Sequence, residues 1–324
     1  MMTSTAPAAI SPLTPLPAPY AVQTEDLRVN FGATKALDRV SARIVPGAIT
    51  GLLGRNGSGK STLLAAIAAY RRPSSGRVLV AGREPYEEPA VVAGICLLRE
   101  AGDFADCSVR QVLQLAASVR PTWSSTVADR LLERFKVPMR KKTTNLSRGQ
   151  RSALAAVIGI ASRSPLTMFD ETYLGMDAPT RYAFYEELLA DYSEQPRTII
   201  ISSHLIEEVE RLFEYVLVLD QGRLLLQESA DDLRERGARV VGQSAAVESF
   251  VAPYTVVSRQ SLGRTMAATI YGALATDARA DASAAGLDIE SVSIQDLFVH
   301  LTADSSHYVP AGEPVDSQHA KELR

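Results

Sequence analysis

The chain has 324 residues, of which 46% are hydrophobic and 22% are charged, and its formal net charge is −3. These values are typical of a globular protein with a buried core, and they exclude the concentrated basic surface that nucleic-acid binding normally requires. Two cysteines are too few for a disulfide framework or a cysteine-rich zinc site. We expect reduced thiols, a cytoplasmic location and no nucleic-acid partner.

The longest apolar stretches, such as ALAAVIGIA, reach only about half of the roughly 20 residues that a membrane-spanning helix needs. The first twenty residues lack the basic start of a signal peptide and contain repeated prolines. The sequence therefore predicts a disordered leader over residues 1–22. A polar segment over residues 303–324 is expected to be a disordered tail.

The next segment alternates apolar and polar residues between Gly and Pro breaks, which predicts two or three strands ending in the buried strand AITGLL. A helix, STLLAAIAAY, and a strand, RVLVAG, follow. SVRQVLQLAASVR and TVADRLLERFKV both have helical spacing, with no strand pattern between them. We expect an inserted helical subdomain at about residues 104–162.

Strand patterns return in PLTMFDE and RTIIISSH, each a nearly continuous apolar run, as in parallel strands covered on both faces. YVLVLDQGRLLLQ predicts a hairpin around Gln221 and Gly222. From Ser229 the chain becomes rich in Ala and ends in SVSIQDLFVHLT before the polar tail. This order predicts an α/β fold, with a core domain over residues 23–228 and a small α/β accessory domain over residues 229–302.

GRNGSGKS at residues 54–61 matches the G-x-x-x-x-G-K-[ST] pattern between a predicted strand and a predicted helix, the context of a phosphate-binding loop. Lys60 is expected to reach the β- and γ-phosphates, and Ser61 to bind Mg²⁺. A Gly-rich turn that only caps a helix is the alternative. The other residues of this loop expected to contact a nucleotide are Asn56, Gly57, Ser58, Gly59 and Thr62.

Acidic residues end the apolar run LTMFDE. Asp170 is expected to hold Mg²⁺, and Glu171 to act as the general base toward water. The alternative is a pair of solvated carboxylates at a strand end. His204 follows another predicted strand, where a contact with the γ-phosphate competes with the role of an ordinary surface or core histidine.

Over residues 23–228 these motifs together resemble the ATP-binding subunit of an ABC transporter. They occur in the family's order: Walker A at 54–62, the signature LSRGQ at 146–150, Walker B at 166–171, the D-loop GMD at 175–177 and the H-loop residue His204. The resemblance implies a P-loop NTPase core of the ABC ATPase type with a helical subdomain. It also implies hydrolysis of ATP, with Mg²⁺ as the cofactor.

In the family, two subunits pair head to tail, and the signature of each closes over the ATP that the other holds. The resemblance implies this role for Ser147, Gly149 and Gln150, and a helix N-terminus at this position would favour a γ-phosphate. A plain helix cap is the alternative. Phe31 lies where the family has an aromatic residue that stacks on adenine, and Asp177 matches the D-loop aspartate that crosses the dimer interface. Strand packing and a helix cap are their respective alternatives.

Some positions depart from the family pattern. Arg99 replaces the glutamine that contacts Mg²⁺ and water, and an arginine cannot accept a hydrogen bond. Arg99 could instead touch phosphate, Glu100 could take over, or this loop could mainly couple the subunit to its membrane partner. Arg148 replaces a signature glycine, and Thr172 and Tyr173 replace a proline and a small polar residue.

The sequence thus predicts an ATP-hydrolysing motor subunit, peripheral on the cytoplasmic face of the membrane, with a separate transmembrane permease subunit and a second ATP-binding subunit as partners. SVSIQDLFVHLT resembles the end of subunits from the export branch, although a plain core helix also fits it. A weakly active subunit that needs a heterodimer partner, and an ABC-type ATPase without a transport role, are the alternatives.

Overall fold

The computed structural model describes residues 18–99, 104, 106–272, 274–275 and 277–303. Residues 18–22, assigned to the leader from the sequence, are among these described residues. The Tyr20 N–H donates to the Pro165 carbonyl (3.2 Å), and the Thr198 hydroxyl donates to the Tyr20 carbonyl (2.7 Å). Tyr20 thus packs onto the hydrophobic core, and the extent of the leader over residues 1–22 stays a prediction.

A six-stranded sheet forms the centre of the larger part of the molecule, with the order β5-β6-β7-β3-β8-β9 in the described chain. Its strands are β5 (Ile95–Arg99), β6 (Leu166–Asp170), β7 (Thr198–Ser203), β3 (Ile49–Gly54), β8 (Tyr215–Asp220) and β9 (Arg223–Ser229). All neighbours are parallel except the β8–β9 hairpin, whose turn is Gln221 and Gly222 as predicted. Every residue of β3, β6 and β7 is buried, as their apolar runs predict.

An antiparallel sheet with the order β2-β1-β4 lies beside it. It contains β1 (Val22–Phe31), β2 (Thr34–Ile44) and β4 (Ser75–Val80). Its apolar face shares a hydrophobic core with α1 (Lys60–Ile67), because the alternating residues of β1 and β2 turn one side inward. A short helix, α2 (Pro89–Val92), precedes β5.

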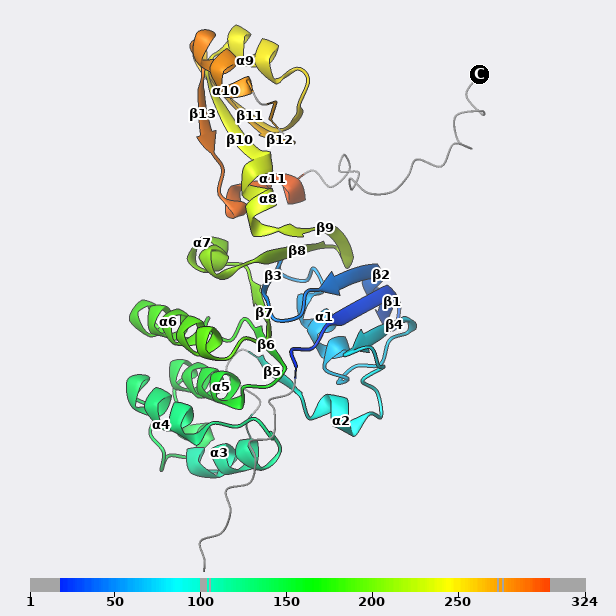
Figure 1. Ribbon diagram of the computed structural model, residues 1–324, viewed down its shortest axis with the longest axis vertical. Coiled ribbons are helices and arrows are strands. Elements are labelled where there is room, and N and C mark those ends of the chain that lie inside the picture. Colours follow the sequence, from blue (N-terminus) through cyan, green and yellow to red (C-terminus); the bar gives the residue numbers. More distant parts are fainter. Residues whose placement is uncertain (1–17, 100–103, 105, 273, 276, 304–324) are drawn as a thin grey trace, which may run out of the picture.

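Helices gather on the other side of the main sheet, at the lower left of Figure 1. They are α3 (Val109–Ser118), α4 (Ser125–Arg134), α5 (Arg148–Ser162) and α6 (Ala178–Glu194), with a 3₁₀ turn, η1 (Thr143–Asn145), before α5. Capping boxes at Ser108–Gln111 and Ser147–Gln150 begin α3 and α5. Between residues 106 and 162 the described chain contains no strand, in agreement with the helical spacing of its sequence.

The smaller part, at the top of Figure 1, has its own antiparallel sheet with the order β11-β12-β10-β13. Its strands are β10 (Gly237–Gln243), β11 (Thr255–Leu262), β12 (Thr265–Tyr271) and β13 (Asp288–Ser291), and its helices are α8 (Ala230–Arg236), α9 (Ser244–Val251) and α10 (Ala278–Ala284). A separate hydrophobic cluster fills it. The domain division after residue 228 stays a prediction.

The last helix, α11 (Ile294–Ala303), returns to the larger part. There it meets α7 (Ile206–Val209) and the 3₁₀ turn η2 (Glu210–Leu212) that follow β7. The Gln295 amide donates to Glu207 Oε1 (2.9 Å), the Glu207 N–H donates back to Gln295 Oε1 (3.3 Å), and the Ile294 N–H donates to Glu210 Oε2 (3.0 Å). Among the described helices, none is long and apolar enough to cross a membrane.

Candidate functional site

The loop between β3 and α1 has the backbone that a phosphate-binding loop needs. Gly57 (φ +80°) and Gly59 (φ +105°) adopt conformations that side chains rarely allow, and a Cβ on Gly59 would lie 2.7 Å from the Ala36 carbonyl. The first turn of α1 has no side-chain cap and no acidic residue, so its N–H groups are available to an anion.

Lys60, the first residue of α1, turns back across this loop and is only 5% exposed. Its ammonium group donates to the Gly54 carbonyl (2.8 Å) and to the Arg55 carbonyl (3.3 Å). A buried ammonium requires polar partners, and these are carbonyl groups of the loop itself. The loop therefore holds a fixed positive charge at its centre.

The carboxyl ends of β6 and β7 place the acidic residues at the same edge of the sheet. The Ser202 hydroxyl donates to Asp170 Oδ1 (2.7 Å), and the Glu171 N–H donates to the Ser202 hydroxyl (3.1 Å). Glu171 has φ +50°, a left-handed conformation that is strained for a residue with a Cβ. Strain of this kind is often found where a side chain is aimed for a function.

Three segments meet at one oxygen of Glu171. Its Oε1 lies 3.3 Å from the Lys60 ammonium nitrogen and 3.3 Å from His204 Nδ1. Lys60 comes from the phosphate-binding loop, Glu171 from the turn after β6, and His204 from the turn after β7. The fold thus brings together a cation, a carboxylate and an imidazole, which can bind phosphate and move a proton.

The polar atoms of the loop before α1 and of the carboxyl end of β6 suit phosphate and a metal ion. The Ser58 hydroxyl is buried and has no hydrogen-bond partner in the described chain, while Ser61 is exposed at the start of α1. No group of three or more His, Cys, Asp or Glu that could hold a metal occurs among the described residues. Ser61 and Asp170 offer two oxygen ligands, which fits Mg²⁺, an ion that keeps waters and binds phosphate oxygens.

The signature residues begin α5 and form its N-terminal capping box, which is the helix-cap alternative that the sequence left open. The Ser147 hydroxyl accepts from the Gln150 N–H (3.2 Å), and the Gln150 amide oxygen accepts from the Ser147 N–H (3.3 Å). A Cβ on Gly149 would lie 2.8 Å from the Gly175 carbonyl, so this glycine permits close contact with the D-loop. The hydrogen bonds that Ser147 and Gln150 make in the described chain join them to each other and not to residues 54–62.

Two predicted site residues lie at the surface. Asp177 caps α6 by accepting from the Thr180 N–H (3.0 Å), and its hydrogen bonds with the Thr180 side chain and backbone hold the pKa of Asp177 below its ordinary value. The Phe31 ring is 49% exposed, and the Arg71 guanidinium lies 4.1 Å from its centroid. A half-exposed ring is not simply packed between strands.

Arg99 ends β5 directly beside Asp170 in the sheet register, and its guanidinium lies 5.6 Å from the centre of the Tyr70 ring. Glu100 lies outside the described residues. The Thr172 hydroxyl donates to the Leu98 carbonyl (3.1 Å), which ties the turn after β6 to β5. The sequence did not indicate Tyr70, Arg71 or Ser202, because each contact joins distant segments and belongs to no motif.

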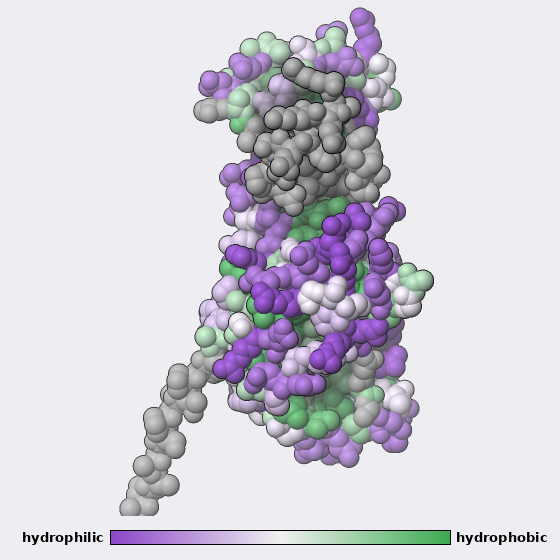
Figure 2. Space-filling model, turned by 90° about the vertical axis from the view of Figure 1, so that its right-hand side faces the viewer, coloured by the Kyte–Doolittle hydropathy of each residue, from purple (hydrophilic) through white to green (hydrophobic). Residues whose placement is uncertain are grey.

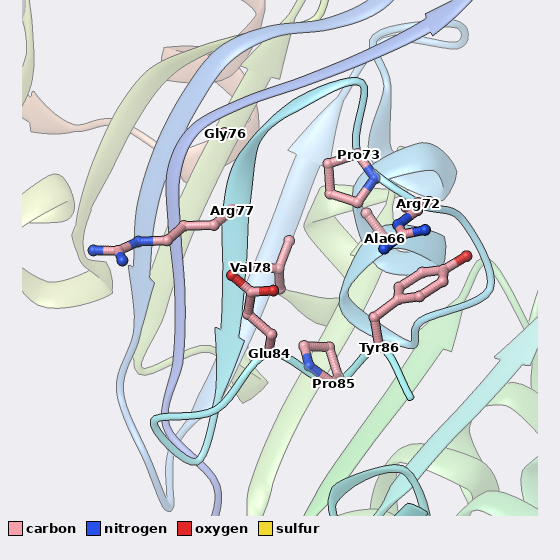
Figure 3. Close-up of a pocket in the computed structure, with 9 residues that line it drawn as sticks. All are labelled: Ala66, Arg72, Pro73, Gly76, Arg77, Val78, Glu84, Pro85 and Tyr86. Carbon is pink, nitrogen blue, oxygen red and sulfur yellow. The ribbon is translucent and has the colours of Figure 1, made fainter. Parts of the chain in front are cut away.

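Figure 3 shows a different cavity, of about 130 Å³, near the C-terminal end of α1. Its lining comes from α1, the turn between α1 and β4, β4 itself and the segment before α2. Figure 3 shows Tyr86 close to Arg72, whose guanidinium lies 5.1 Å from the ring centre. The lining consists of Ala66, Arg72, Pro73, Gly76, Arg77, Val78, Glu84, Pro85 and Tyr86. None of these belongs to the predicted site, so this cavity is separate from it.

A parallel sheet that carries this loop and an acidic pair at its carboxyl edge defines a P-loop nucleotide-hydrolysing protein. A family model described as ABC transporter matches residues 37–173. The ABC transporter ATP-binding protein YtrB of Bacillus subtilis is 30% identical over 220 residues, which are 68% of this chain and 75% of YtrB. The chain belongs to this family of ABC transporter ATP-binding proteins, and it is an ATPase that binds ATP.

Two further comparisons extend this result. The daunorubicin resistance ATP-binding protein DrrA3 of Streptomyces coeruleorubidus is 28% identical over 307 residues, which are 88% of this chain and 96% of DrrA3. A solved dimeric post-hydrolysis state of an ATP-binding cassette with ADP and Pi matches with a TM-score of 0.57 and 19% identity, covering 64% of this chain and 98% of that one. The latter likeness shows the fold alone. The family and the α/β P-loop fold predicted from the sequence are confirmed.

Proposed function

We propose that two ATP-binding subunits, at least one of which is this chain, pair head to tail. They hydrolyse ATP at sites that both subunits build, and this hydrolysis drives export by a separate transmembrane subunit. The observation that carries this proposal is the convergence of Lys60 and His204 on Glu171 Oε1, at 3.3 Å each. A site with this geometry can bind the γ-phosphate and activate water beside it.

Within the site, Lys60 binds the β- and γ-phosphates together with the backbone N–H groups of residues 56–62. Ser61 and Asp170 hold Mg²⁺, which when bound neutralises charge on the phosphate oxygens. Glu171 accepts a proton from the attacking water, and His204 holds the γ-phosphate. Phe31 stacks on the adenine base through its exposed ring.

The second half of the site comes from the partner. Ser147, Gly149 and Gln150 stand at an exposed helix N-terminus, which favours a γ-phosphate through its N–H groups and partial positive charge. Asp177 lies next to them in the fold, since the D-loop packs on Gly149. The hydrogen bonds of Ser147 and Gln150 do not reach residues 54–62 of the same subunit, which supports a site completed by another subunit.

A groove of about 350 Å³ beside Arg99 supports a protein partner. It is lined mainly by apolar side chains, and Tyr70, Leu115 and Val119 on its border are exposed. Figure 2 shows hydrophobic side chains gathered at the lower end of this face, at the level of α3. We propose that a cytoplasmic segment of the transmembrane subunit docks there, which would place this chain on the cytoplasmic face of the membrane.

Export as the direction of transport is supported by the similarity to DrrA3, whose name records resistance to a drug. Its match of 307 residues is longer than the predicted core domain and therefore includes at least part of the predicted accessory domain. The presence of Glu171 and His204 in contact favours an active subunit over one that needs a heterodimer partner for hydrolysis.

The test compares ATP hydrolysis and size-exclusion behaviour of the wild type and of Glu171→Gln, in ATP and Mg²⁺. We expect the variant to bind ATP, to lose at least about 100-fold in turnover and to elute as a dimer, because the amide cannot accept the proton. Glu248→Gln, an exposed carboxylate on α9, serves as the matched control. A Glu171→Gln variant that hydrolyses ATP as fast as the wild type would contradict the proposal, whereas a wild type that binds ATP but neither hydrolyses it nor dimerises would show that this chain needs a different ATP-binding subunit as its partner.

A further inference from the structure

Three consecutive residues, the last two of β7 and His204 directly after them, contact the end of β6 or the turn that follows it. Ser202 binds Asp170, and His204 binds Glu171, as described above. Between them, the Ser203 hydroxyl accepts a hydrogen bond from the buried Tyr173 hydroxyl. We infer that Tyr173 is a positioning residue that fixes His204 beside Glu171 through Ser203, an inference that rests on the proposed function.

The hydrogen bond between Tyr173 and Ser203 acts on the backbone around His204. The Ser203 hydroxyl also accepts a hydrogen bond from the Leu205 N–H (2.8 Å). The same oxygen is therefore bonded to Tyr173, in the turn after β6, and to the residue that follows His204. The His204 side chain itself is 36% exposed. Since burial holds this imidazole only in part, its position depends on how firmly the turn is held.

Tyr173 is well placed to hold that turn. Its ring is fully buried and lies parallel to Phe184 and edge-on to Tyr185, with centroid distances of 6.4 Å and 5.7 Å. Both partners belong to α6. Burial raises the pKa of Tyr173 well above its usual range, so its hydroxyl is protonated and can donate near neutral pH.

Tyr173, which donates to Ser203, stands at a position where the chain departs from the family pattern. A small polar residue there could not fill the space between β7 and α6 and also carry a hydroxyl to Ser203. The bulky residue therefore connects the helical layer to the turn that contains His204. Thr172, the other departure, connects the same segment to β5 through the Leu98 carbonyl.

The experiment measures steady-state ATP hydrolysis by Tyr173→Phe, which keeps the ring and removes only the hydroxyl. We expect kcat to fall about three- to tenfold while KM for ATP stays within about twofold, because one buried hydrogen bond is lost and the nucleotide contacts are kept. Tyr185→Phe removes the same atom from the neighbouring ring, outside the link to Ser203, and should keep the wild-type kcat.

Ser203→Ala removes the acceptor and should lower kcat at least as much as Tyr173→Phe. If both act through one hydrogen bond, the double variant is no slower than Ser203→Ala alone. An unchanged kcat in Tyr173→Phe, or equal losses in Tyr173→Phe and Tyr185→Phe, would overturn the inference. Should Tyr173→Phe fail to fold, a wild-type kcat in Ser203→Ala overturns it equally.

Glu171→Gln separates this inference from the proposed function. If that variant still turns over ATP at the wild-type rate, the proposed function is wrong and the inference falls with it. If Glu171→Gln is inactive but Tyr173→Phe is fully active, only the role of Tyr173 is wrong.

Discussion

The phenyl ring of Phe31 is half exposed at the end of β1, with the Arg71 guanidinium over it. Arg71 is itself anchored by a hydrogen bond to the Asn30 carbonyl (3.2 Å), so the cation is held in place. The guanidinium covers one face of the ring, so the base that we propose to stack on Phe31 would meet a ring already in contact with a cation.

We expect Phe31→Ala to raise the Kd for ATP about three- to tenfold, because a stacking ring is lost, while kcat stays within about twofold. Titration of ATP binding by calorimetry measures the change. Phe31→Tyr, which keeps an aromatic ring, is the control and should bind as the wild type does. Equal affinity in the alanine variant would show that the ring does not contact the base.

The variant Arg99→Gln restores the glutamine that the family has at this position and so tests what the arginine does there. Because its guanidinium lies over Tyr70 at the border of the groove, we expect Arg99→Gln to change the response to the membrane partner more than hydrolysis itself. The basal ATPase rate of the purified variant should stay within about twofold, whereas partner stimulation in vesicles should fall at least about threefold. A basal rate that rises severalfold would show instead that this position contacts the metal.

Much of the site could be predicted at the level of single residues. Lys60, Asp170, Glu171 and His204 all follow apolar runs, and the carboxyl ends of parallel strands share an edge, so their meeting was foreseeable. The contacts of Arg71 with Phe31 and of Tyr173 with Ser203 were not, because they depend on how separate elements pack. The roles in binding and catalysis that the sequence assigned to the site residues stay predictions.

At the scale of elements, apolar runs and helical spacing predicted β3, β6, β7, α3 and α4, whereas helix ends were less predictable. The expected helix STLLAAIAAY ends at Ile67, since Ala69 turns into the left-handed region (φ +60°). That break directs Tyr70 and Arg71 away from the helix toward Arg99 and Phe31. No sequence pattern indicated it, because alanine ordinarily favours helix.

The start of α5 and the D-loop pack so closely that one added carbon should separate them. In Gly149→Ala the new Cβ would lie 2.8 Å from the Gly175 carbonyl, a backbone atom that cannot rotate away. We expect a loss of about 1–3 kcal/mol in the free energy of unfolding and a loss of ATP-induced dimerisation. Denaturant unfolding and size exclusion measure the two effects, and a variant that keeps wild-type values in both would show that this contact yields easily.

At the scale of the whole molecule, the last helix of the predicted accessory domain, α11, contacts α7, the helix that follows His204. Gln295 of α11 exchanges two hydrogen bonds with Glu207 of α7. The last helix of the chain therefore steadies the segment next to the site, although its own sheet lies at the far end of the molecule (Figure 1).

We expect Gln295→Ala to speed amide hydrogen exchange in α7 about three- to tenfold, because these bonds close a short helix that has few other constraints. Mass spectrometry of peptides covering residues 206–212 measures it. Gln260→Ala, an exposed glutamine on β11, is the control. Unchanged exchange in α7 would mean that α11 contributes nothing to its stability.

The left-handed backbone of Glu171 implies a trade-off between a robust fold and an active one. Asn and Gln both replace the carboxylate by an amide, but Asn tolerates positive φ far better than Gln. Thermal unfolding should therefore show Glu171→Asn to be more stable than Glu171→Gln by up to about 1 kcal/mol, and equal stability would show that the backbone is not strained. A library of variants selected for heat resistance alone should consequently discard this glutamate early, and with it the general base that we propose for the hydrolysis of ATP.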